Sequence, residues 1–71
     1  MKITYDPQAD AMFISLQTGK YELTDEIGEG ILVHHAKNGK ILSIEILDVR
    51  DKMPQEVVKY LLTTAKITAA R

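Results

Sequence analysis

The dipeptide Asn38-Gly39 constrains the fold more than any other local feature, because it stands between two runs of apolar residues. Asn-Gly is typical of a β-hairpin turn of type I′, in which both central residues take positive φ. This turn makes three cross-strand pairs, most of them apolar: Ile31 with Ile46, Val33 with Ile44, and His35 with Leu42. A shift of one residue would put Val33 opposite Ser43. We therefore predict a hairpin from Ile31 to Leu47 in this register.

Strand patterns also precede this hairpin. Ile3 and Tyr5 alternate with polar residues, and the turn around Pro7 is followed by the mostly apolar segment 11–16. The dipeptide Thr18-Gly19 is a second turn candidate. It would pair apolar residues on one face of a hairpin: Leu16 with Tyr21, and Ile14 with Leu23. We predict this hairpin too, with a strand over 21–27 that ends in a bulge or bend at Gly28 and Gly30.

A helical pattern follows the charged stretch 48–52. Pro54 suits a first helical turn, and Glu56 complements the helix dipole there. Apolar residues then recur at helical spacing: Val57, Val58, Leu61, Leu62 and Ala65. We predict a helix over 51–67 with Asp51 as its N-cap, and a weak tail from Ile67 to Arg71. Its apolar stripe packs on the sheet or on a partner.

With 71 residues the chain is expected to form one domain, with an antiparallel sheet over 1–48 and a helix over 51–67. The fold class is α+β, an antiparallel β-meander of about five short strands followed by one C-terminal helix. A core this small rarely supplies more than about 3–5 kcal/mol, and the chain has no cysteines for disulfides. We therefore expect homo-oligomerisation to add stability to that of the small core. No stretch resembles a signal peptide or a membrane span, so the expected location is cytoplasmic.

Three segments resemble a known family. They are YDPQADAMFISL, DEIGEGILV and GKILSIEIL, and in this order they resemble the small prokaryotic family called domain of unknown function 2283. The likeness spans roughly Met1 to Asp48, and the order of the segments is more specific than any one of them. The family has no established activity. Its genomic setting is similar to that of antitoxin-like proteins, which are partners of small toxins with a ribonuclease-type fold. Where the family usually has an aspartate and then an aromatic residue, this chain has His34-His35, so a role of that aspartate is not implied here.

His34 and Glu45 are the candidate catalytic residues. Adjacent strand residues point to opposite faces, so His34 and His35 cannot chelate one metal ion together. In the predicted register His34 lies opposite Ser43 and diagonal to Glu45, and a histidine beside a carboxylate can act as a general base. Glu45 is the one charge within the strand 41–47, and the resemblance also places a glutamate there. Without a nucleophile or pocket signal beside them, the structural interpretation of both residues is favoured.

Other charged residues have structural and functional interpretations. Asp6 and Asp10 flank Pro7 and could contribute to a cation site, but turn chemistry explains both. Four acids form a predicted edge: Glu22, Asp25, Glu26 and Glu29. They protect a strand from edge-to-edge aggregation, or they form an electrostatic face for a basic partner. The net charge of −1 argues against nucleic-acid binding, and the sequence predicts no metal site and no cofactor.

The leading hypothesis is therefore a non-enzymatic protein-interaction module, antitoxin-like, with a basic partner encoded nearby and a tendency to self-associate. Its expected interaction residues are the four acids of the edge and Val57, Val58, Leu61 and Leu62 of the helix. The alternative is a small enzyme or ligand-binding protein that uses Glu45 and His34 at a subunit interface.

Overall fold

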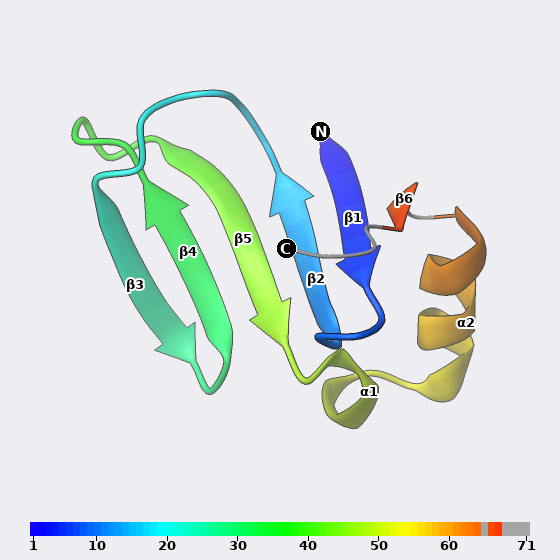
Figure 1. Cartoon of the computed structure of the whole chain (residues 1–71). Coiled ribbons are helices and arrows are strands. Elements are labelled where there is room, and N and C mark those ends of the chain that lie inside the picture. The colour runs from blue at the N-terminus through cyan, green and yellow to red at the C-terminus, as the bar shows by residue number, and fades with distance from the viewer. Residues whose placement is uncertain (65, 68–71) are drawn as a thin grey trace.

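The computed structural model describes residues 1–64, 66 and 67, which form one largely antiparallel sheet and two short helices (Figure 1). In chain order the elements are β1 (Lys2–Asp6), β2 (Ala11–Ser15), β3 (Leu23–Gly28), β4 (Ile31–His35), β5 (Ile41–Leu47), α1 (Val49–Lys52), α2 (Gln55–Thr64) and β6 (Lys66–Ile67). The strands lie in the order β3-β4-β5-β2-β1-β6, and only the short β6 pairs in parallel. The predicted α+β fold, five antiparallel strands followed by a helix, is confirmed.

The hairpin of β4 and β5 has the predicted register over most of its length. Ile31 lies opposite Ile46, and Val33 lies opposite Ile44. Near the turn the prediction is wrong, because His35 lies opposite Ile41 and not Leu42.

The turn itself explains this difference. Gly39 N donates to Ala36 O, and Ala36 N donates to Lys40 O, so three residues and not two connect the strands. Among residues 36–40 only Gly39 has positive φ, so the expected type I′ turn is wrong as well. Leu42 is the extra residue in β5 that restores the predicted register from Ser43 onward.

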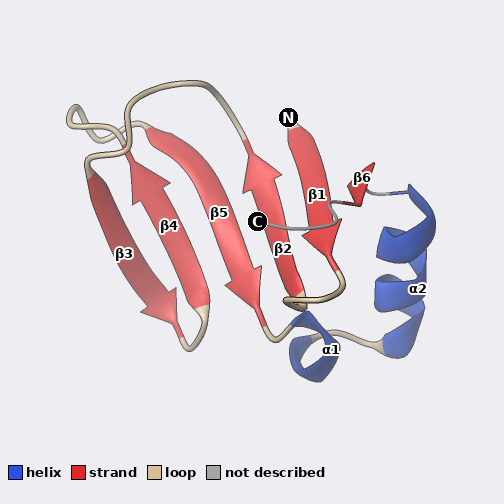
Figure 2. Ribbon diagram, in the orientation of Figure 1, coloured by secondary structure: helices blue, strands red, loops and turns tan. Residues whose placement is uncertain are grey.

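The second predicted hairpin, with its tip at Thr18-Gly19, is wrong. β2 pairs with β5 and not with β3, so Ile14 lies opposite Ile44 and Met12 opposite Ile46. These pairs are as apolar as the predicted local ones, and the central strand β5 thereby gains a partner on both edges. Residues 16–22 form a crossing loop that connects β2 to β3 (Figure 2). Leu16 N and Gln17 N both donate to Leu42 O, which fastens the start of this loop to the bulge in β5.

The bend predicted at Gly28 and Gly30 is confirmed. The register of β3 against β4 shifts between Glu26 and Gly28, and Gly30 has a φ of 69° in the turn that follows.

The predicted helix over 51–67 is wrong in its bounds. Asp51 lies inside α1 and is not an N-cap, and Met53 is extended, with φ −122° and ψ 149°.

Pro54 explains why the two helices are separate, because a proline disfavours helical geometry at the residue before it. The next helix, α2, begins at Gln55 and ends at Thr64. Residues 66 and 67 form β6. Ala65 of the predicted stripe and residues 68–71 of the predicted tail lie outside the described residues.

The core lies between α2 and the face of the sheet to which Tyr5 and Met12 point. Its buried members are Tyr5, Met12, Val49, Val58 and Leu61. Val58 and Leu61 of α2 therefore pack on their own sheet, which decides between the two positions left open for the helical stripe. We call this the core face. By strand pairing it also carries Ile14, Val33 and Ile44.

Candidate functional site

The opposite face of the sheet carries the two candidate catalytic residues. His34 lies on β4 opposite Ser43, as predicted, and Glu45 lies on β5 between Phe13 and Leu32. The structure brings the candidates together, since His34 Nε2 is 3.3 Å from Glu45 Oε1. Their side chains are 12% and 21% exposed, so the contact is largely covered.

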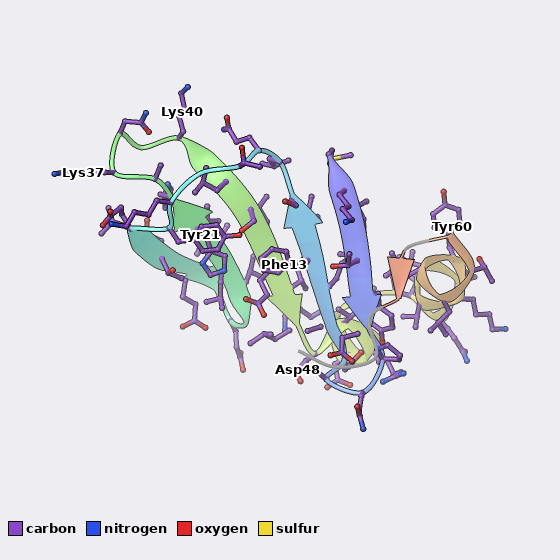
Figure 3. The ribbon with its side chains drawn as sticks, turned by 45° about the horizontal axis from the view of Figure 1, so that its top comes forward. Phe13, Tyr21, Lys37, Lys40, Asp48 and Tyr60 are labelled. Atoms are coloured by element: carbon purple, nitrogen blue, oxygen red, sulfur yellow. The ribbon has the colours of Figure 1, made fainter. Side chains whose placement is uncertain are left out.

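Two aromatic rings cover His34. Phe13 of β2 stacks on it with ring centres 5.9 Å apart, and Tyr21 stacks with ring centres 5.0 Å apart and only 12° between the planes. Figure 3 shows Phe13 and Tyr21 on the same side of the sheet, although Tyr21 comes from the crossing loop 16–22. The sequence prediction missed Tyr21, because it placed this residue in a regular strand. Phe13 had a signal, since it is the one aromatic residue among polar neighbours on its face of β2.

The polar groups of this cluster form hydrogen bonds within the cluster. His34 Nδ1 is 2.8 Å from Thr24 Oγ1, and the Tyr21 hydroxyl is 2.7 Å from Ser43 Oγ. A carboxylate can only accept, so with Glu45 ionised His34 Nε2 donates to it and a neutral ring accepts from Thr24 at Nδ1. Both ring nitrogens are therefore engaged, and Ser43 is fully buried. This arrangement holds the crossing loop on the sheet, and in this tautomer His34 could act as a general base only after its Nδ1 releases Thr24.

His35 points to the other face, as expected for neighbours in a strand. Its Nε2 lies 3.0 Å from Asp25 Oδ2 on β3, so the two histidines have separate carboxylate partners. Within residues 1–64, 66 and 67 no group of three or more His, Cys, Asp or Glu side chains could hold a metal ion.

Asp6 and Asp10 have structural partners in the turn between β1 and β2. Asp6 is buried, and its Oδ1 accepts from Gln8 N and Ala9 N. Asp10 Oδ1 accepts from the Tyr5 hydroxyl at 2.7 Å, and Asp10 Oδ2 accepts from Arg50 N at 3.2 Å. Burial, with the hydrogen bond and charge of Asp10, raises the pKa of the Tyr5 phenol. Turn chemistry and these contacts account for both carboxylates.

The acidic residues lie along β3 and its ends. In the described sheet β3 pairs only with β4, so its other edge is open. Glu26 accepts from Gly30 N, and Glu22 lies 3.4 Å from Lys20. These four carboxylates, at Glu22, Asp25, Glu26 and Glu29, belong to residues that are all exposed.

The predicted helical stripe is divided between core and surface. Val58 and Leu61 are buried, whereas Val57 and Leu62 are 38% and 39% exposed. A cavity of about 500 Å³ lies beside Leu62, lined also by Arg50, Gln55, Val58 and Lys59. His34 and Glu45 do not line this cavity.

No helix in the described part of the chain is long and apolar enough to cross a membrane.

Comparison with known proteins agrees with the resemblance found in the sequence. A family model described as "Protein of unknown function (DUF2283)" matches residues 2–50, from β1 to the start of α1. No curated protein and no solved structure matches the chain.

Proposed function

The chain belongs to the DUF2283 family, whose model covers more than half of it, and we propose that it is a non-enzymatic protein-interaction module that binds a basic partner. The observation that carries this proposal is the open edge of β3. An edge strand offers unpaired backbone N–H and C=O groups, to which an extended segment of another protein can add. In this chain the edge is also acidic, because Asp25 and Glu26 lie within β3, and Glu22 and Glu29 lie at its ends.

The charge of this edge determines which partner it fits. Two copies of β3 that paired in antiparallel fashion would bring acids opposite acids, which is destabilising. A strand that carries lysine or arginine would instead gain both backbone hydrogen bonds and favourable charge pairs. The proposed partner is therefore a basic protein, and the genomic setting that the family resemblance implies is the reason to expect that it is encoded nearby.

A small toxin with a ribonuclease-type fold meets this description, because a protein that handles RNA needs basic groups for the phosphates. The proposed role of the chain is then that of an antitoxin-like protein in the cytoplasm. The proposal includes self-association of the chain, since a core this small gains stability from a second copy.

The test is a pull-down from the native host with the tagged chain, followed by an affinity measurement on any captured protein. The edge variant replaces three exposed acids by neutral residues: Glu22→Gln, Glu26→Gln and Glu29→Gln. The matched control removes three exposed acids elsewhere: Asp48→Asn, Asp51→Asn and Glu56→Gln. We expect capture of a basic protein, and binding about tenfold weaker for the edge variant only, equivalent to about 1.4 kcal/mol. Equal loss in both variants, or capture of no basic protein, contradicts the proposal.

One observation favours the second candidate, a small enzyme or ligand-binding protein. It is the 3.3 Å contact between His34 Nε2 and Glu45 Oε1, which resembles an acid–base pair. If this candidate is right, small molecules from an NMR fragment screen will shift resonances around His34, and Glu45→Gln will abolish the shifts. If no fragment shifts these resonances, the candidate fails.

A further inference from the structure

The core face of the sheet is only partly covered by helix. The buried strand residues of the core cluster that contains Val58 and Leu61 of α2 come from β1 and β2, and from β5 only Ile46 packs against this cluster. Helix α2 lies at the side of the sheet that carries β1 and β6 (Figure 1). Over β3, β4 and β5 the same face carries a set of apolar residues that we call the open patch: Leu23, Ile31, Val33, Ile41 and Ile44. Leu23 is 60% exposed and Ile41 41% exposed. Ile31 and Ile44 are half-buried around the buried Val33.

The open patch has almost no unpaired charge. Among the positions of β3, β4 and β5 that share this face, the ionisable ones are Asp25 and His35. These two contact one another at 3.0 Å across the strands. The opposite face differs, since it carries Glu26, His34 and Glu45.

We propose that the open patch is the surface through which the chain self-associates, with the open patch of a second copy packed against it. This inference rests on the self-association included in the proposed function, and it names the surface. A basic partner finds a single carboxylate here, that of Asp25, which already contacts His35, whereas a second copy brings a surface that is equally apolar. An interface in which one patch meets itself is what two-fold symmetry requires.

The shape of the chain allows this packing. Face-to-face sheets lie about 10 Å apart, and a helix with its side chains is about 10–12 Å thick. The sheet of the second copy therefore fits above the open patch in the same layer as α2, beside that helix. By symmetry the first sheet lies in the same layer as α2 of the copy. Two layers result, each containing one sheet and one helix.

The size of the patch determines how strong the association is. Three strands about 4.8 Å apart and about five residues long cover only about 240 Å² of sheet. A stable interface buries about 800 Å² on each partner, so this dimer belongs to the weak class. We expect dissociation constants of about 10–100 μM.

The test is sedimentation velocity on the whole chain between about 5 and 500 μM, a range that spans the expected dissociation constant. Leu23→Lys and Ile41→Lys each place a charge in the open patch. Leu62→Lys is the matched control, because Leu62 on α2 is as exposed as Ile41, at 39% against 41%. We expect dimerisation of the wild type and of the control, and at least tenfold weaker dimerisation of both patch variants.

Other outcomes overturn the inference in distinguishable ways. If the wild type stays monomeric over the whole range, self-association fails for the proposed function and for this surface together, and binding of a basic partner is judged by its own pull-down. If the wild type dimerises but the patch variants dimerise equally well, only the surface assignment fails. The same conclusion follows if Leu62→Lys weakens the dimer as much as they do.

Methyl NMR tests the surface without a substitution that could disturb folding. On dilution of the wild type, the resonances of Ile31, Ile41 and Ile44 are expected to shift, because these methyl groups leave the interface. If they stay fixed while other methyl resonances shift, the dimer uses another surface.

Discussion

The Tyr5 hydroxyl donates a 2.7 Å hydrogen bond to Asp10 Oδ1 across the turn between β1 and β2. Tyr5 is fully buried in the core, and Asp10 takes a left-handed φ of 54°. Asp10 also accepts from the backbone of Arg50, and its carbonyl accepts from Val49 N. One carboxylate thus connects the core, the first turn of the sheet and α1.

This contact predicts a loss of stability at alkaline pH. Burial, the Asp10 hydrogen bond and the Asp10 charge raise the pKa of the Tyr5 phenol above 10.0, against the opposing effect of Arg50. A pKa raised by folding means that the contribution to stability is complete below about pH 10 and is lost as pH rises through the folded-state pKa. Urea denaturation between pH 8 and 11 is expected to show a falling free energy of unfolding in this window.

Tyr5→Phe is the control for this prediction. At pH 7 it is expected to lower the free energy of unfolding by about 1.5 kcal/mol, because a hydrogen bond to a charged acceptor is lost. Above pH 10 its stability is expected to fall less steeply than that of the wild type, since Tyr21 and Tyr60 are present in both proteins. Parallel curves for the two proteins would contradict the role of Tyr5.

Gly39 supports a second prediction, because its φ is 89° and a Cβ placed there meets nothing within 4 Å. Gly39→Ala is therefore expected to destabilise the chain by about 1 kcal/mol through backbone strain alone. Gly28→Ala is a suitable control, since Gly28 has no positive φ and its added Cβ makes an ordinary 3.4 Å contact with Ile31. Thermal denaturation that showed equal effects for the two variants would contradict this explanation.

The sequence predicts the β4–β5 hairpin well because two independent signals agree there. Alternation of apolar residues sets Val33 opposite Ile44, and Asn38-Gly39 sets the turn nearby. The error in turn type is local, because one extra loop residue is compensated by the extra Leu42 in β5. His34 and Glu45 lie past this bulge, so the sequence could bring them together correctly.

The wrong predictions share one physical cause. An apolar strand can pair with more than one other strand, and local sequence patterns do not show which pairing is more stable. Ile14 could pair with Leu23 nearby or with Ile44 far along the chain, and both pairs are apolar. The position of Tyr21 follows from that choice, because a crossing loop and not a hairpin brings it over His34. The break before Pro54 could be predicted from the sequence, since a residue before proline avoids helical geometry.

The stack of Tyr21 on His34 supports a third prediction. Aromatic pairs contribute about 0.5–1.5 kcal/mol beyond area burial, so a double-mutant cycle of Tyr21→Leu and His34→Leu is expected to give a coupling of about 1 kcal/mol. Hydrogen exchange of the amides in 16–22 is expected to accelerate in either single variant, because each variant removes one of the two stacked rings. A coupling near zero would mean that the stack does not hold the loop, and that its hydrogen bonds to Leu42, Ser43 and His35 do so instead.

A fourth prediction compares neighbouring leucines on α2, Leu61 and Leu62. Leu61 is 6% exposed and packs in the core with Tyr5 and Met12, whereas Leu62 is 39% exposed. Leu61→Ala is expected to destabilise the monomer by about 2–3 kcal/mol, and Leu62→Ala by less than about 1 kcal/mol. Urea denaturation at a protein concentration below that of dimerisation measures both. Because a chain of this size has only about 5 kcal/mol of stability, Leu61→Ala is expected to shift the midpoint to roughly half its wild-type value. Equal effects of the two substitutions would contradict the packing of α2 on its own sheet, and would return the helical stripe to the role of a partner-binding surface.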